Sequence, residues 1–145
     1  MALFNSMNVS ASGMTAQRLR TDIIAQNIAN VNTTRDENGE VYRRKNVIFE
    51  ERDVTGFSQI LLRTAGTVGN GVKVTSIYSD EESPTRLVYD PSHPDANEEG
   101  YVEYPNVNTV QEMTDMIDAS RSYEANVTAF NATKNMALKA LEIGK

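Results

Sequence analysis

Apolar side chains recur at seven-residue intervals through the last third of the chain. Residues 109–143 contain neither Gly nor Pro, the strongest helix breakers, so the repeat predicts one long helix. Thr109 is expected to cap this helix, because Glu112 follows at the spacing of a capping box. Gly144 supplies a stop signal. The predicted stripe consists of Met113, Met116, Ile117, Tyr123, Val127, Phe130, Leu138 and Leu141.

A looser repeat of the same kind predicts a second helix within residues 1–34. Arg18 and Thr21 interrupt its apolar row, so this helix would make a weak coiled coil by itself. Asn30 offers a natural end, because Asn tolerates the left-handed geometry of a helix C-terminus. The apolar positions of this stripe include Phe4, Met7, Met14, Ile24 and Ile28.

Two interpretations of the stripes stay open from periodicity alone. The terminal helices could pair as an ordinary two-helix core, with their apolar positions satisfied inside one molecule. Alternatively, both stripes could also be assembly surfaces that meet neighbouring molecules. The spacing of apolar residues favours neither interpretation, because both place the same side chains on one helical face.

The middle of the chain, residues 35–108, contains all four Pro and most of the Gly. Short runs rich in β-branched and aromatic residues predict strands within Glu40–Glu51, after the hairpin-type pair Asn70–Gly71, and at Thr85–Tyr89. The run Phe57–Arg63 is ambiguous, and the proline-punctuated stretch Asp90–Pro105 leaves little room for regular structure.

These elements predict an α+β fold in two domains. Residues 1–34 and 109–145 would form a discontinuous coiled-coil domain from the paired long helices. Residues 35–108 would form a small β-rich hairpin domain with the proline-punctuated connector.

Composition excludes several functional classes. The 145 residues carry a net charge of −6, and residues 35–108 alone hold 14 acidic and 8 basic side chains. Binding to nucleic acid needs clustered Lys and Arg, so no nucleic-acid partner is expected. There is no apolar run long enough to span a membrane and no secretory signal pattern at the N-terminus. The absence of Cys excludes disulfides and thiol catalysis.

No constellation of catalytic residues can be assembled from the sequence. The single histidine, His93, lies between two prolines and is interpreted as a turn residue rather than a metal ligand or a base. The acidic clusters at Asp80–Glu82 and Asp95–Glu99 lack the order of a calcium loop and are interpreted as solvated charge. We therefore expect no enzyme activity, no cofactor, no metal and no small-molecule substrate.

Two long strings near the ends of the chain resemble a known family. The string from Ser10 to Thr34 is similar to the N-terminal signature of bacterial flagellar axial proteins of the rod, hook and junction. The string from Gly100 to Asn126 is similar to their C-terminal signature. The length of the chain, with Y-R-R-K at Tyr42–Lys45 and Y-D-P-S-H-P-D-A-N at Tyr89–Asn97, resembles a short proximal rod protein.

The resemblance implies a structural subunit of the flagellar basal body. In this family the terminal helices form a coiled-coil core, copies stack helically around a tube, and the rod transmits motor torque to hook and filament. The implied partners are copies of the chain, other rod and basal-body proteins, and the flagellar type III export apparatus, through which subunits pass without a cleaved signal peptide. The implied location is the rod within the cell envelope. The alternative is a soluble coiled-coil adaptor outside flagella.

Overall fold

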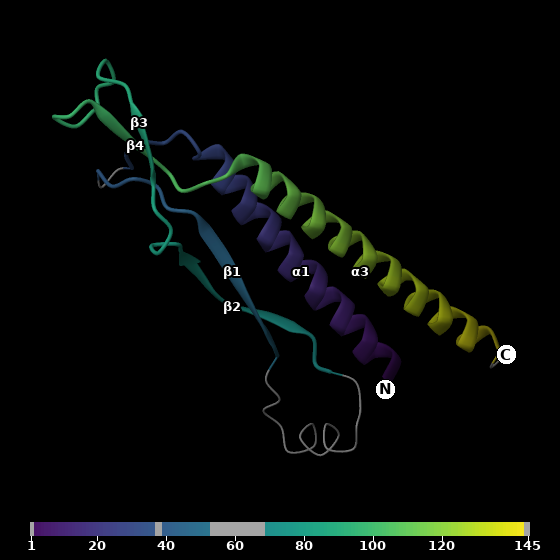
Figure 1. Cartoon of the computed structure of the whole chain (residues 1–145). Helices are drawn as coiled ribbons and strands as arrows, with labels where there is room; N and C mark the ends of the chain where they lie inside the picture. The colour runs from purple at the N-terminus through teal and green to yellow at the C-terminus, as the bar shows by residue number, and fades with distance from the viewer. Residues whose placement is uncertain (1, 37–38, 53–68, 144–145) are drawn as a thin grey trace. The chain divides into compact units, whose positions relative to one another are not determined.

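The computed structural model describes residues 2–36, 39–52 and 69–143. Along the chain, one long helix is followed by four short strands and then by a second long helix (Figure 1). This composition confirms the predicted α+β class. The predicted run Phe57–Arg63 lies outside the described residues. The elements are α1 (Ala2–Ala29), β1 (Lys45–Glu51), β2 (Val72–Ser79), β3 (Arg86–Tyr89), β4 (Tyr101–Tyr104) and α3 (Thr109–Ile143).

The chain folds into two compact units, and both helices contribute to each. Unit 1 contains the described residues of Met1–Leu19, Ile48–Ser76 and Asp118–Lys145. Unit 2 contains those of Arg20–Val47 and Ile77–Ile117. The domain boundaries drawn from the sequence, at residues 34/35 and 108/109, stay a prediction.

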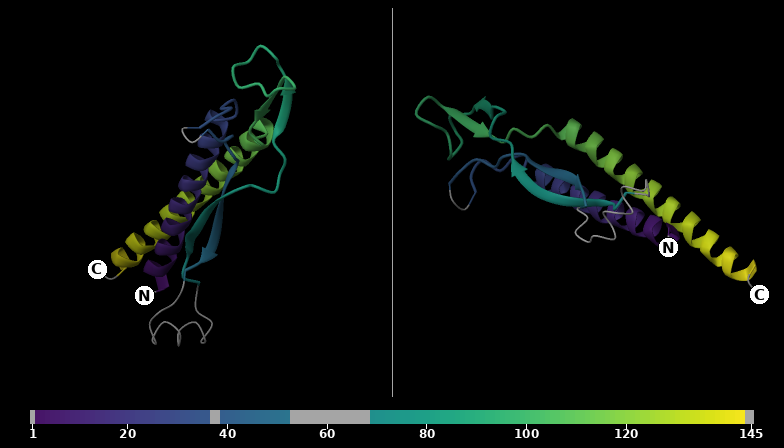
Figure 2. Two further views of the ribbon diagram at one scale, coloured as in Figure 1. Left: turned by 90° about the vertical axis from the view of Figure 1, so that its left-hand side faces the viewer. Right: turned by 90° about the horizontal axis from the view of Figure 1, so that it is seen from below.

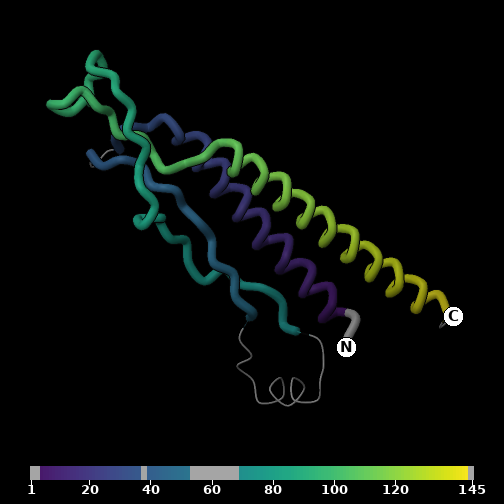
Figure 3. Tube along the Cα trace, in the orientation of Figure 1, coloured from purple at the N-terminus to yellow at the C-terminus, as the bar shows by residue number. Residues whose placement is uncertain are grey.

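In unit 1 the two helical segments run in opposite directions and approach each other closely (Figure 3). A Cβ atom added at Gly13 would lie 2.8 Å from the side-chain oxygen of Asn126. Only small side chains permit such an approach, since the distance between helix axes follows from the residues at the contact. The buried side chains of this unit include Ser10, Ser12, Ala16, Ala119 and Thr133.

The start of β2 is fastened to α1 by one serine of unit 1. The Ser12 hydroxyl donates to the carbonyl of Val9 at 2.7 Å and accepts from the backbone N–H of Val72 at 3.0 Å. Gly71, immediately before, has φ of +90° and passes so close to the Ser12 side chain that a Cβ would collide with it. Gly71, which belongs to the predicted hairpin pair Asn70–Gly71, is therefore required for the close contact between this segment and α1.

Strands β1 and β2 form one two-stranded sheet, and β3 and β4 form another. In unit 2, residue pairs run antiparallel from Arg86–Tyr104 to Tyr89–Tyr101, and Figure 2 shows this hairpin with its connecting loop. The expectation that Asp90–Pro105 lacks regular structure is therefore wrong at Tyr101–Tyr104. Gly100, at φ +83°, turns the chain so that these four residues can pair with β3.

The N-terminus of α3 differs in its capping from the prediction. Asn108, not Thr109, is the cap, because its side-chain oxygen accepts from the backbone N–H groups of Val110 at 3.1 Å and Gln111 at 3.4 Å. Glu112 is consequently free of the capping role, and its carboxylate points into unit 2 instead.

Among the described residues, no helix has the length and apolarity that a membrane span requires.

Candidate functional site

A buried polar cluster in unit 2, here called the polar anchor, joins the two helices to the segment before β1. Its centre is Asn27 of α1, whose side chain is 1% exposed. The Asn27 amide donates to the carbonyl of Lys45 and to Glu112 Oε2, both at 2.9 Å. Its oxygen accepts from the Tyr42 hydroxyl and from the backbone N–H of Lys45, both at 2.9 Å. All four bonding positions of the amide are therefore filled.

The carboxylate of Glu112 supplies the negative charge of the anchor and is fully buried. Arg44 Nε donates to Glu112 Oε1 at 2.5 Å, and Arg44 Nη2 donates to Asp115 Oδ2 at 3.2 Å. Arg20 of α1 lies 3.6 Å from the other oxygen of Asp115. A buried carboxylate is tolerated when it is paired and hydrogen-bonded, and both conditions hold here.

The polar anchor also changes the acidity of Tyr42. Burial raises the pKa of the Tyr42 hydroxyl above its ordinary value, and the nearby charge of Glu112 raises it further. The phenol therefore remains a neutral donor to Asn27 at physiological pH.

Asn106 holds the Arg44 backbone in place from the segment before α3. Its side-chain oxygen accepts from the Arg44 N–H at 2.8 Å, and its amide donates to the carbonyl of Asp80 at 3.0 Å. The Asp80 backbone N–H in turn donates to the Arg44 carbonyl at 2.8 Å. Hydrogen bonds from Ser83 lower the pKa of the Asp80 carboxyl below its usual range. These contacts fix the arginine that neutralises Glu112.

The stripe residues singled out from the sequence fall into three classes of exposure. Ile24 is buried at 5% exposure. Half-buried side chains are Met7, Met14, Ile28, Met116, Val127 and Phe130. Exposed side chains are Phe4 (67%), Met113 (56%), Ile117 (53%), Tyr123 (39%), Leu138 (49%) and Leu141 (72%). Within one molecule the helices therefore leave about half of the stripe uncovered.

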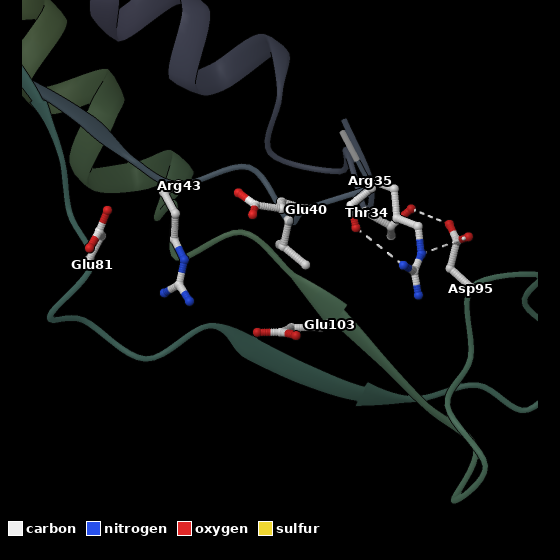
Figure 4. Close-up of a pocket in the computed structure, with 9 residues that line it drawn as sticks. Thr34, Arg35, Glu40, Arg43, Glu81, Asp95 and Glu103 are labelled. Carbon is white, nitrogen blue, oxygen red and sulfur yellow. Dashed lines mark hydrogen bonds and ion pairs between the residues drawn. The ribbon is translucent and has the colours of Figure 1, made fainter. Parts of the chain in front are cut away.

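A second polar feature of unit 2 is an open cavity of about 550 Å³ (Figure 4). Asp95 closes one side, where it accepts from the Thr34 hydroxyl at 2.6 Å and pairs with Arg35 Nε at 3.2 Å. Arg43 donates to the carbonyl of Ser83 at 3.1 Å on the other side. The carboxylates of Glu40, Glu81 and Glu103 also line it.

The described part of the chain contains no group of three potential ligands placed to hold a metal ion. His93 lies in the turn that follows β3, where its Nδ1 accepts from the backbone N–H of Asp95 at 3.1 Å. His93 therefore lies in a turn, as its place between two prolines predicted.

Family comparisons identify both ends of the chain. The family model described as "Flagella basal body rod protein" matches residues 7–35, and "Flagellar basal body rod FlgEFG protein C-terminal" matches residues 98–143. The flagellar basal-body rod protein FlgC of Bacillus subtilis is 53% identical over the whole of both chains. This chain belongs to the FlgC family of flagellar rod proteins. The FlgC proteins of Borreliella burgdorferi (49% identity, 99% of this chain and 98% of theirs) and Escherichia coli O6:H1 (38%, all of both chains) are further relatives.

Sequence reasoning did not predict the polar anchor of this FlgC-family chain, although its parts lie in the strings that carried the resemblance. Asn27 belongs to the N-terminal string, Arg44 to the Y-R-R-K motif, and Glu112 to the C-terminal string. The only sign of the anchor in the sequence was the presence of these three polar residues within the quoted strings, two of them on helices with an apolar stripe. Their pairing follows only from the fold.

Proposed function

We propose that this protein is a non-enzymatic structural subunit of the proximal rod, and that its apolar stripe is the surface through which it meets neighbouring subunits. The supporting observation is the exposure of six large apolar stripe side chains at 39–72% in a chain that is similar to FlgC over its full length. Complete burial of an exposed side chain of this kind is worth about 1.5–3 kcal/mol, so a neighbour that covers several of them favours association.

Rod assembly of this kind uses contacts between unlike surfaces. Such head-to-tail contacts continue into a helical tube when the rotation between subunits does not close into a ring. In this proposal the protein contacts copies of itself and other rod proteins, forms part of the export channel wall and transmits motor torque. It reaches the rod through the flagellar type III export apparatus without cleavage of a signal peptide, and it resides where the rod crosses the cell envelope.

The test compares an exposed stripe residue with its neighbour in sequence. Ile117→Asp should abolish swimming and incorporation into purified basal bodies, because an interface would then bury an unpaired carboxylate at a cost of several kcal/mol. Asp118→Asn, at an exposed position, should retain both. Thermal unfolding of the purified variants should be similar, since Ile117 is 53% exposed.

Two results would contradict the proposal. Normal swimming by the Ile117→Asp variant would show that the stripe is not an interface. Absence of the unmodified protein from basal bodies would remove the rod assignment itself. A non-flagellar coiled-coil adaptor has no support in the comparisons, because the relatives named above are all rod proteins.

A further inference from the structure

The β3–β4 hairpin of unit 2 presents an apolar face to solvent. Cross-strand partners share a face, so the pairs Leu87–Glu103 and Tyr89–Tyr101 lie together on one side. Leu87 is 63% exposed, Tyr89 is 65% exposed and Tyr101 is 41% exposed, whereas Val102 on the opposite side is fully buried. We call the set Leu87, Tyr89, Tyr101 and Glu103 the hairpin face.

The aromatic residues of the hairpin face are held in place although they are exposed. The rings of Tyr89 and Tyr101 meet edge to face, with centroids 5.3 Å apart and planes at 67°. A Cβ added at Gly100 would lie 2.9 Å from the Tyr89 ring, so the backbone supports that ring closely. Aromatic anchors that are already ordered lose little conformational freedom when they bind a partner.

The segment of the chain that carries the hairpin face is strongly acidic. Residues 80–103 contain one basic and eight acidic side chains, which gives a net charge of −7. Glu103 also lines the cavity of Figure 4, together with Glu40 and Glu81. In the described part of the chain none of these three carboxylates forms an ion pair. The Glu103 carboxylate accepts a hydrogen bond from the Thr85 hydroxyl.

We propose that the hairpin face docks a cationic surface of another basal-body protein, outside the contacts made by the apolar stripe. An apolar side chain of the partner covers Leu87 and Tyr89, and a Lys or Arg beside it reaches the carboxylates at the cavity. Charge complementarity selects this chemistry, since an acidic surface would be repelled by a segment of −7. The proposal rests on the proposed function only in placing the partner in the basal body.

A photo-crosslinking experiment identifies what covers the face. Leu87 is replaced with a photoreactive phenylalanine analogue in the bacterium that makes this protein, and basal bodies are purified after illumination. We expect a crosslink to a partner peptide of net positive charge, mapped by mass spectrometry. A crosslink to a neutral or acidic peptide, a crosslink to a second copy through an acidic segment, or no crosslink in basal bodies that contain the protein overturns the proposal. Immunoblotting for the protein in the same basal bodies tests the rod assignment separately.

A matched pair of substitutions tests the sign of the charge. Leu87→Lys and Leu87→Glu remove the same apolar contact but introduce opposite charges, and both replace a side chain that is 63% exposed. Incorporation of the Lys variant into basal bodies should fall about tenfold or more, as for truncation of an interface anchor, and the Glu variant should lose clearly less. Equal incorporation of the two variants, or a greater loss for Glu, overturns the assignment of a cationic partner.

Discussion

The two units hold the same pair of helices together with different chemistry. In unit 1 the helices meet through small side chains, such as Ala16 and Ala119, with Gly13 against Asn126. In unit 2 they meet through the polar anchor, in which Asn27 and Glu112 are buried at 1% and 0% exposure. Of the large apolar stripe residues, Ile24 is buried, six are half-buried and six remain exposed.

The two kinds of contact differ in how strictly they specify the register between the helices. Small side chains allow close approach but distinguish poorly between neighbouring registers, because one Ala resembles another. A buried carboxylate and amide accept only the partners that satisfy their bonds, so a shift in register would leave them unpaired at high cost. A change of register would therefore break the bonds of the polar anchor, whereas the close contact through small residues leaves six large apolar stripe side chains exposed.

The largest effect is expected from loss of the anchor's cation. Arg44→Ala leaves the buried Glu112 carboxylate with only the Asn27 amide as a partner. Removal of one member of a buried pair costs about 3 kcal/mol or more, and urea unfolding of the purified protein measures it. Lys139→Ala is the control, because its pair with Glu142 is exposed and should contribute less than about 0.5 kcal/mol. Equal losses in the two variants would show that the anchor does not stabilise the fold.

A smaller effect is expected from overfilling the close helix contact of unit 1. Ala119→Leu adds three carbon atoms where the side chain is 0% exposed, and overpacking of this kind costs about 1–3 kcal/mol. Ala125→Leu makes the same change at an exposed position of α3 and should alter stability by about 0.5 kcal/mol at most. The same urea titrations compare the two variants. If Ala119→Leu is as stable as Ala125→Leu, small residues are not what unit 1 requires.

The tyrosine of the anchor predicts a loss of stability in alkali. Because the folded protein raises the pKa of Tyr42 above the ordinary 10.0, the unfolded chain loses this proton first. The stability that protonated Tyr42 contributes to the fold is fully present below pH 10, and it is lost as the pH rises through the pKa of Tyr42 in the folded protein. Tyr42→Phe should cost about 1 kcal/mol at neutral pH through the lost hydrogen bond to Asn27, and it should remove this alkaline component. Unfolding measured against pH for both proteins is the test, and parallel curves above pH 10 would contradict it.

The smallest effect is expected at Gly13. Gly13→Ala gains about 1 kcal/mol of helix propensity, but the new methyl group displaces the Asn126 side chain from its bond to the Ser122 carbonyl. That bond is worth about 1 kcal/mol, so the net change in unfolding free energy should be near zero. Gly13→Leu cannot be accommodated by rotation of one side chain and should be clearly destabilised. A large loss in the Ala variant would mean that the helices of unit 1 cannot adjust at all.

The sequence alone was sufficient to predict both helices and the α+β class. A seven-residue apolar repeat without Gly or Pro has few other stable conformations, and α3 extends over Thr109–Ile143 as its pattern indicated. The family, too, was evident from the two terminal strings and is established by full-length relatives. Strand β4 was not predicted, because Tyr101–Tyr104 becomes a strand only through pairing with β3 across the turn at Gly100.

Only the tertiary structure decided the role of the polar residues. Glu112 has the local pattern of a helix cap, yet Asn108 takes that role, and Glu112 is buried against Asn27 and Arg44, which lie 85 and 68 residues away in the sequence. Local propensity is set by neighbours along the chain, whereas the burial of a charge is favourable only where distant groups converge to satisfy it. The apolar stripe likewise follows from the sequence, but which of its side chains remain exposed depends on how closely the two helices pack.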